Sequence, residues 1–572
     1  MSDLQTLCAA VDGPRMMREL ATMAQWVKLS GTADEATSLR HIRAQLETLG
    51  FRTTLLEHDA YISLPGASAV TVDNVTVPSI THSFSRPSGD DGLTGRLVYV
   101  GAGNDPDFAG QDLRACIVLV DGIATPPVSR RASLAGAAGQ LHISPHEHLH
   151  EMCISPVWGN PSSVTLEQLP ATVVCSILPS AGDPLRDRIR RGEQPRVALR
   201  AEVDTGWRKT PILQADMDAP DADAPFILFS GHHDTWYYGV MDNGSANVAM
   251  LEVARLCASK REQWRRGLRL CFWSGHSHGR YSGSTWYVDQ HWDELDHRCA
   301  VHLNVDSPGA RGADILSNVG SMAPLFAVAA EAIAARSGQT LLGKRMSRGA
   351  DQSFNGLGLP ALFGDISEPP ASAIGPHCWW WHTSHDLLEN IDEANQVRDT
   401  SIYVHAAWRL LTDRILPLDF AAHARDLLTE LARLAATLGS RFPLDSLIAA
   451  AETTRDLAKA LNGTAKTASP GMIDRALMHV SRALIPMDYT SGDRFSHDPA
   501  LPVPSWASLG AIRALAAAPE HSNSAYFMTV DATRARNRLL HALRRANGVL
   551  ARASGRQDAR VPERGTWLNE RP

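Results

Sequence analysis

Four mostly apolar runs in the middle of the chain are each followed by residues that commonly bind metals. The runs are Phe226–Phe229, Leu268–Trp273, Ala300–Val305 and Pro360–Phe363. Their length, and the helical periodicity of the stretches between them, predict strands of an α/β sheet with helices on both faces. Ligands of such sheets bind beyond the carboxyl ends of the strands, so we expect the polar residues that follow the runs to converge.

The hydrophobic pattern changes along the chain and predicts four segments. It is typical of helix from about residue 13 to residue 50, where Gly50 occupies a C-cap position, and strand-like pieces follow. Short β segments between Gly, Pro and Asp turns then predict an inserted β-rich domain. Strands that alternate with helices form the next segment, and helical periodicity continues after it. The predicted segments are residues 1–93, 94–207, 208–415 and 416–572.

Composition narrows the class of protein. The chain has 572 residues and a net charge of −7, which argues against nucleic acid as its main partner. No apolar run approaches the roughly 18 residues of a membrane-spanning helix. The first residues show neither the basic region nor the apolar region of a signal peptide, so we expect a cytoplasmic protein. Its eight cysteines form no Cys-x-x-Cys pair and are predicted to be reduced, buried thiols.

Most of the polar residues that follow the four runs carry an imidazole or a carboxylate. They are His232, His233 and Asp234, then Asp242 in the next loop, then His276 and His278 with Ser277 between them, then Asp306, and finally His382. Imidazole and carboxylate are the ligands that zinc and similar divalent metals prefer. Any one of them could be structural, but the whole set in this order predicts a metal site with one or two ions.

Five motifs around these residues resemble the M28 metallopeptidase family, in its branch of glutamate carboxypeptidase II and the transferrin receptor. They are Gly231–Trp236, Asp242–Ser245, Asn304–Ser307, Gly349–Phe354 and Trp381–Ser384. The resemblance implies a zinc-aminopeptidase-like mixed sheet. It also implies that residues 94–207 form a protease-associated domain and that the tail, with Tyr489–Asp493, forms a helical dimerisation domain.

The resemblance also implies a role for each ligand. His232 and Asp306 would hold one metal ion, His382 would hold the other, and Asp242 would bridge the two. Asp234 would orient His232 from outside the ligand set. Such a centre activates a shared water for attack on an amide carbonyl. Trp381 stands where the family often has a tyrosine that steadies the oxyanion.

The chain departs from the family after the second run. The family carries two adjacent glutamates there, a general base and a metal ligand, whereas this chain has Ser274–Tyr281 without a carboxylate. Aligned from the strand, His276 and Ser277 replace the pair; aligned from Gly283, Ser277 and His278 do. His276 can accept a proton near neutral pH or serve as a ligand, and His278 is the alternative ligand. A mononuclear site and loss of catalysis are the other outcomes.

Further residues are candidates for substrate contact or chance matches. Arg280 and Tyr281 could bind a substrate carboxylate or cap the following helix, and Asp351 is a further candidate for substrate binding. The stretch His146–His150 matches the zincin pattern His-Glu-x-x-His, but prolines on both sides make a long helix unexpected there. The arginines of residues 534–545 would suit an anionic partner or a solvated helix face.

The sequence therefore predicts a metal-dependent hydrolase that cleaves an amide or peptide bond in a small molecule or short peptide. The enzyme alternative is a non-peptide amidase or carbamoyl-type hydrolase with a remodelled metal site. The alternative from another class is a non-catalytic scaffold on the same fold, although unpaired buried carboxylates are costly without a metal. The resemblance of the tail implies a homodimer, and neither nucleic acid nor membrane is expected as a partner.

Overall fold

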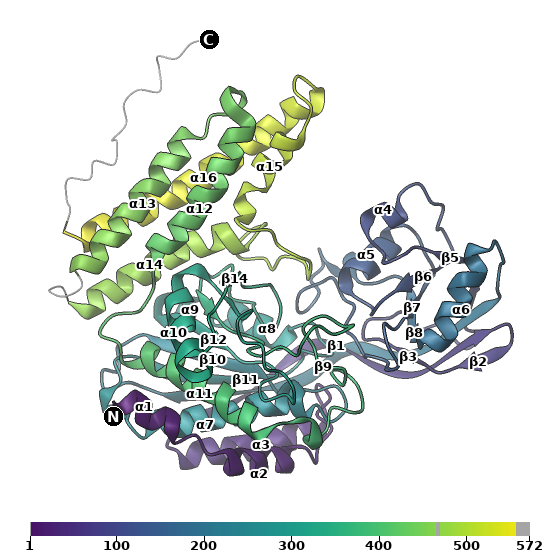
Figure 1. Ribbon diagram of the computed structural model, residues 1–572, viewed down its shortest axis with the longest axis horizontal. Helices are drawn as coiled ribbons and strands as arrows, with labels where there is room; N and C mark the ends of the chain where they lie inside the picture. The colour runs from purple at the N-terminus through teal and green to yellow at the C-terminus, as the bar shows by residue number, and fades with distance from the viewer. Residues whose placement is uncertain (1, 465–468, 556–572) are drawn as a thin grey trace.

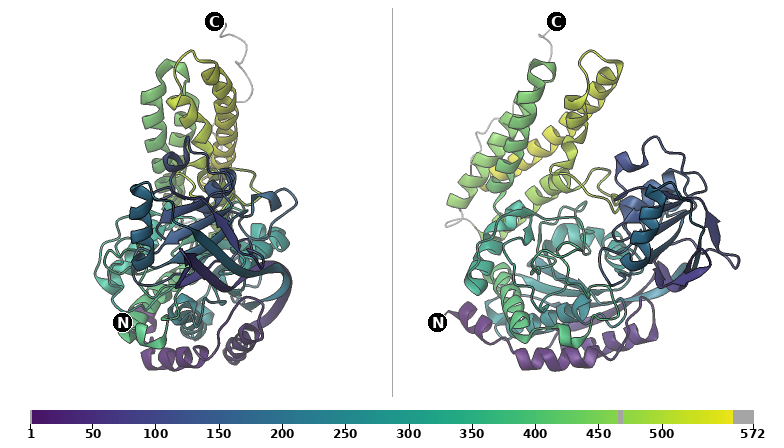
Figure 2. Two further views of the ribbon diagram at one scale, coloured as in Figure 1. Left: turned by 90° about the vertical axis from the view of Figure 1, so that its right-hand side faces the viewer. Right: turned by 45° about the vertical axis from the view of Figure 1, so that its right-hand side comes forward.

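The computed structural model describes residues 2–464 and 469–555. Figure 1 shows three parts: an α/β part around a large sheet, a smaller part that contains a second sheet, and a helical part. The right-hand view of Figure 2 shows that the helical part stands on the α/β part, apart from the second sheet. The architecture confirms the predicted α/β class.

The large sheet is mixed, and its central strands are parallel. Its order is β14-β13-β15-β12-β10-β11-β9-β1-β2, with β4 paired to β9. The strands are β1 (Arg52–Val72), β2 (Val75–Val77), β4 (Leu93–Gly95), β9 (Val197–Met217), β10 (Phe226–His232), β11 (Gly267–Trp273), β12 (Cys299–Asn304), β13 (Gly320–Ser321), β14 (Lys344–Arg345) and β15 (Ala361–Leu362). Because β10, β11, β12 and β15 are parallel, their carboxyl ends lie at one edge.

Helices cover both faces of this sheet because its central strands are apolar on both sides. In β10, Ile227 and Phe229 belong to the core that α7 and α11 complete, whereas Phe226 and Leu228 pack with α8 and α9. The helices of this part are α1 (Asp3–Ala9), α2 (Gly13–Met23), α3 (Ala33–Thr48), α7 (Ala246–Ala258), α8 (Ser282–Gln290), α9 (Trp292–Arg298), α10 (Phe326–Ser337) and α11 (Glu393–Thr412).

The second sheet is joined to the first by two long antiparallel strands, β1 and β9 (Figure 1). Its order is β3-β8-β7-β6-β5, and three of its four pairings are parallel. Its elements are β3 (Ser79–Thr81), β5 (Leu97–Tyr99), α4 (Asp105–Phe108), β6 (Ile117–Asp121), α5 (Pro126–Leu134), β7 (Gly139–Ile143), β8 (Val173–Ile177) and α6 (Pro179–Arg190). The insert therefore contains helices that the turn-rich pattern did not predict.

The helical part is built from amphipathic helices whose apolar faces join one continuous core with the α/β part. They are α12 (Phe420–Leu438), α13 (Asp445–Thr464), α14 (Pro470–Tyr489), α15 (Gly510–Ala517) and α16 (Asn523–Ala553). All eight cysteines are free and buried, as predicted. Among the described residues, no helix is both long and apolar enough to cross a membrane.

Two buried histidines make the second sheet sensitive to acid. Burial lowers the pKa of His82 to about 3 and that of His142 to about 4, from 6.5. The unfolded chain therefore binds more protons than the folded chain below pH 6.5, so stability falls as the pH falls through this window. At pH 5.5 each histidine should lower the free energy of unfolding by roughly 1.4 kcal/mol. We expect the midpoint of urea unfolding to lie at a lower urea concentration at pH 5.5 than at pH 7.5. The difference between the two midpoints should be smaller in His82→Asn. An equal difference in both proteins would contradict the assignment.

Candidate metal centre

The predicted ligands converge because parallel strands end at the same edge of the sheet. His232 is the last residue of β10, and Asp306 follows β12, the neighbouring strand. The His232 Nε2 atom lies 3.5 Å from an Asp306 oxygen. His382 comes from the loop after β15 and meets the same cluster through Asp242. The residues that the sequence singled out from four separate strands thus form one site.

Asp242 stands between the two histidines. Its Oδ1 atom lies 2.9 Å from His232 Nε2, and its Oδ2 atom lies 3.1 Å from His382 Nε2. The Nδ1 atoms of both rings face backbone carbonyls, of Asp234 at 2.8 Å and of Glu151 at 2.7 Å. A neutral ring that donates from Nδ1 has only a lone pair at Nε2. Both Nε2 atoms therefore point at carboxylate oxygens, an arrangement that needs a shared proton or a metal cation at each contact.

The charges at the centre favour a cation. Burial disfavours charge on His232, yet the carboxylates of Asp306 and Asp242 raise its pKa well above 6.5. Burial would raise the pKa of Asp242, but its contacts with His232 and His382 hold that pKa well below the ordinary value. The buried atoms His232 Nε2 and Asp242 Oδ1 have no hydrogen-bond partner among the described residues. Imidazole and carboxylate donors in this arrangement fit zinc.

Asp386 holds the loop that carries Asp242. Its carboxylate accepts hydrogen bonds from the backbone N–H groups of Met241, at 2.8 Å, and Asp242, at 3.0 Å. Burial raises the pKa of Asp386 to about 7. Asp386 lies four residues after His382, so one short segment supplies a candidate ligand and fixes the loop of another. The sequence pattern alone gave Asp386 no role.

His276 faces the centre, and His278 does not. One ring nitrogen of His276 lies within 4.8 Å of the ligand atoms of His232 and Asp306, and the His276 ring stacks on His232 at 3.7 Å. His278 is buried against Trp236, and its Nδ1 atom is 3.1 Å from Ser30 Oγ. The loop that begins with the turn at Gly275 (φ +73°) places His276, and not His278, beside His232 and Asp306.

Asp351 and Asp234 act on the loop that carries His276. The Asp351 carboxylate lies 2.7 Å from His276 Nδ1 and accepts a 2.6 Å hydrogen bond from Ser284 Oγ. Asp351 is buried and is not among the residues that line the cavity. The Asp234 carboxylate accepts hydrogen bonds from the backbone N–H groups of His276 and Ser277. Asp234 contacts His232 Nδ1 through its backbone carbonyl at 2.8 Å, and its carboxylate lies 3.9 Å from the same atom.

A cavity of about 300 Å³ opens onto the centre. Arg280 and Tyr281 line it, and the Arg280 Nε atom is buried without a hydrogen-bond partner among the described residues. Trp381 forms a wall, stacked on His382 at 3.5 Å and on His377 at 4.0 Å. Further lining residues that the sequence did not single out are Asp365, His377, Met152 and Cys153. Asp365 lies three residues beyond β15, and that position is the signal that could have found it.

The insert also supports the distal ligand. Besides accepting from His382 Nδ1, the backbone of Glu151 donates from its N–H to the His382 carbonyl at 3.0 Å. His150 Nδ1 lies 2.5 Å from the Trp381 carbonyl. Residues 145–151 are not helical, so the zincin-like pattern there is a chance match, as predicted. This loop instead positions the distal segment.

Comparison with known proteins agrees with the geometry. Residues 214–406 match the model of Peptidase family M28. A probable glutamate carboxypeptidase of Zea mays, VP8, is 22% identical over 366 residues, which cover 50% of this chain and 49% of that protein. The probable lipoprotein aminopeptidase LpqL of Mycobacterium tuberculosis is 24% identical over 54% of this chain and 57% of that protein. The chain spans about half the length of these relatives.

Solved structures share the fold. An aminopeptidase from Aneurinibacillus sp. strain AM-1 superposes with a TM-score of 0.56 and 20% identity, over 72% of this chain and 96% of that one. The zinc aminopeptidase BSAP from Bacillus subtilis gives a TM-score of 0.55 and 18% identity, over 70% and 96%. The mixed sheet with helices on both faces is therefore the fold of zinc aminopeptidases.

Proposed function

We propose that this chain, with its M28 peptidase domain, is a metal-dependent hydrolase of peptide or amide bonds in short peptides or small molecules. The observation that carries the proposal is Asp242, whose two oxygens face the Nε2 atoms of His232 and His382 at 2.9 and 3.1 Å. His232, Asp242 and Asp306 would hold a zinc ion, with a nitrogen of His276 in reach. When bound, zinc lowers the pKa of a water molecule and polarises a carbonyl group.

The residues around the centre supply proton transfer and orientation. The Asp351 carboxylate accepts a hydrogen bond from His276 Nδ1. His276 Nε2 is then free to bind the metal or to accept a proton from the attacking water. Trp381, stacked on His382, forms one wall of the pocket that would receive the scissile group. A homodimer, a protease-associated function of the insert and a cytoplasmic location stay predictions.

The proposal is tested by metal removal. Zinc should be required for hydrolysis of amino-acid amides and dipeptides, so a chelator should abolish turnover and added zinc should restore it. Turnover of carbamoyl compounds alone would favour the remodelled amidase. Purified protein that binds no zinc on titration and hydrolyses none of these substrates would contradict the proposal and favour a scaffold protein.

The serine at position 277 bears on how many zinc ions each chain binds. Aligned from the strand, Ser277 takes the place of the family's metal-binding glutamate; it lines the same cavity as Asp242 and His382 but offers no carboxylate. We therefore expect about one tightly bound zinc per chain, because a hydroxyl is a poor zinc ligand. Ser277→Glu should raise the content to about two, measured by elemental analysis, and Ser277→Ala should leave it unchanged. Two zinc ions in the unaltered protein would contradict this prediction.

The position of Arg280 indicates that the substrate carries a carboxylate. Its guanidinium is the charged donor placed at the cavity that can bind a carboxylate. Arg280→Gln should raise KM for dipeptides about tenfold or more, because a hydrogen bond between charged groups is worth roughly 1.5–3 kcal/mol. KM for amino-acid amides, which lack a carboxylate, should change little. An equal change for both substrates would show that Arg280 only shapes the cavity.

A further inference from the structure

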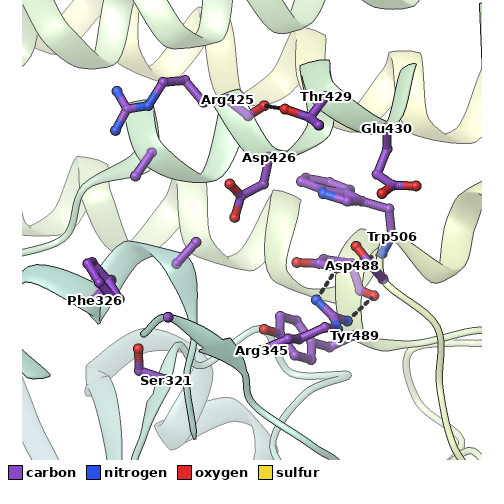
Figure 3. Close-up of a pocket in the computed structure, with 14 residues that line it drawn as sticks. Ser321, Phe326, Arg345, Arg425, Asp426, Thr429, Glu430, Asp488, Tyr489 and Trp506 are labelled. Atoms are coloured by element: carbon purple, nitrogen blue, oxygen red, sulfur yellow. Dashed lines mark hydrogen bonds and ion pairs between the residues drawn. The ribbon is translucent and has the colours of Figure 1, made fainter. Parts of the chain in front are cut away.

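Two cavities adjoin the helical part, away from the metal centre. One, of about 440 Å³, is drawn in Figure 3. In it Arg345 is paired with Asp488 at 2.7 Å and lies over the ring of Tyr489. Of its carboxylates, Asp426 alone lacks a partner among the described residues, and a lone carboxylate does not define a ligand.

The second cavity, of about 390 Å³, lies between α14 and α16 and has an excess of positive charge. Its charged lining residues are Arg482, Asp493, Arg494, Arg538 and Arg545, with His541 beside them. Because the guanidinium of Arg482 is paired with Asp296 at 3.3 Å, three guanidinium groups remain against one carboxylate. The volume falls within the roughly 300–1,000 Å³ typical of small-molecule sites.

The arginines of α16 share one face and lack partners. Arg538, His541 and Arg545 are three and four residues apart, a spacing that places side chains on the same side of a helix. Neither Arg538 nor Arg545 makes an ion pair or hydrogen bond with any residue that the structure describes. Arg513, elsewhere in the helical part, is by contrast paired with Glu430 at 3.0 Å. The charges on this face of α16 are therefore uncompensated.

The opposite wall adds two arginines held in place by the backbone. Arg494 donates from Nη2 to the Leu357 carbonyl at 2.9 Å, while its Nε atom is buried without a partner among the described residues. Burial lowers the pKa of Arg494, although Asp296 opposes this, and the nearby charge of Arg545 lowers it further. Arg482 is fixed by the carbonyls of Leu295 and Cys299 and is paired with Asp296 at 3.3 Å. The like charges of Arg494 and Arg545 destabilise one another, and an anion between them would relieve this repulsion.

We propose that this cavity binds a small anion with at least two negative charges, of the phosphate-monoester or polyphosphate class. The guanidinium fork matches phosphate oxygens in pairs, and a dianion offsets more of the excess charge than a monocarboxylate does. The proposal goes beyond the hydrolase activity and does not depend on it, since none of these arginines lines the catalytic cavity.

The test is calorimetric titration of the full chain with inorganic pyrophosphate at low salt. The variant R538Q/R545Q removes two charges from the cavity. The matched control R534Q/R544Q removes two exposed charges of the same helix that do not line it. We expect binding to the unaltered protein and the control, and at least tenfold weaker binding to R538Q/R545Q. Absence of pyrophosphate binding, or equal weakening in both variants, would overturn the proposal. Amide hydrolysis should be unchanged in R538Q/R545Q, so this result and the hydrolase result are independent.

Discussion

Asp242→Asn is expected to abolish zinc binding and to lower kcat/KM by about a thousandfold. The substitution replaces one ligand oxygen by an NH₂ group and removes the negative charge between His232 and His382. Metal catalysis is worth several kcal/mol, and each factor of ten in rate is about 1.36 kcal/mol. Zinc content is measured by elemental analysis, and kcat/KM with an amino-acid amide.

The fold should survive this substitution. The backbone N–H groups of Met241 and Asp242 still donate to Asp386, so the loop keeps its hydrogen bonds. The control is Asp289→Asn, which removes a carboxylate paired with His497 away from the cavity and should change neither zinc content nor turnover. Normal zinc content in Asp242→Asn would show that Asp242 is not a ligand and would remove the main support for the proposed centre.

The sequence predicted this centre where strand geometry determines it. His232 and Asp306 end or follow neighbouring parallel strands, so their proximity follows from the periodicity of apolar runs. The loop after β11 was different, because both alignments of residues 276–278 fitted the pattern. Only contacts with distant segments distinguish the surroundings of the two histidines. The His278 ring lies beside Ser30 Oγ, and the Asp351 carboxylate contacts His276 Nδ1. Periodicity carries no information about such contacts between loops.

The same distinction applies outside the centre. The arginines of α16 are visible in the sequence at helical spacing, yet the pattern suits a solvated face equally well. What makes them a candidate site is the opposite wall, with Arg494 from the connector after α14. Likewise Asp386 supports the loop of Asp242 across more than a hundred residues of sequence. Residue type and spacing predict which side chains can do chemistry, whereas long-range packing decides which of them meet.

His276→Ala is expected to lower kcat by about a hundredfold or more, the usual contribution of a general base. The imidazole is the group at this position that can take up a proton or join the ligands, because the loop after β11 contains no carboxylate. Asp351→Asn should have a smaller effect of the same kind, roughly 10–100-fold in activity or zinc affinity, since it loosens the imidazole without removing it.

The pH profile and the zinc content of His276→Ala distinguish a catalytic role of His276 from packing. If His276 accepts the proton, the pH profile of kcat should lose its acidic limb in His276→Ala, while KM stays within about twofold because ground-state binding is unchanged. If His276 is a ligand, zinc content should fall instead. His276→Glu restores the family's residue and distinguishes a third case: a sharp rise in hydrolysis of leucine amide would show that the histidine sets specificity and is dispensable as a base. Unchanged zinc content and unchanged kcat in His276→Ala would remove His276 from the site, and the stacking on His232 would then be packing alone.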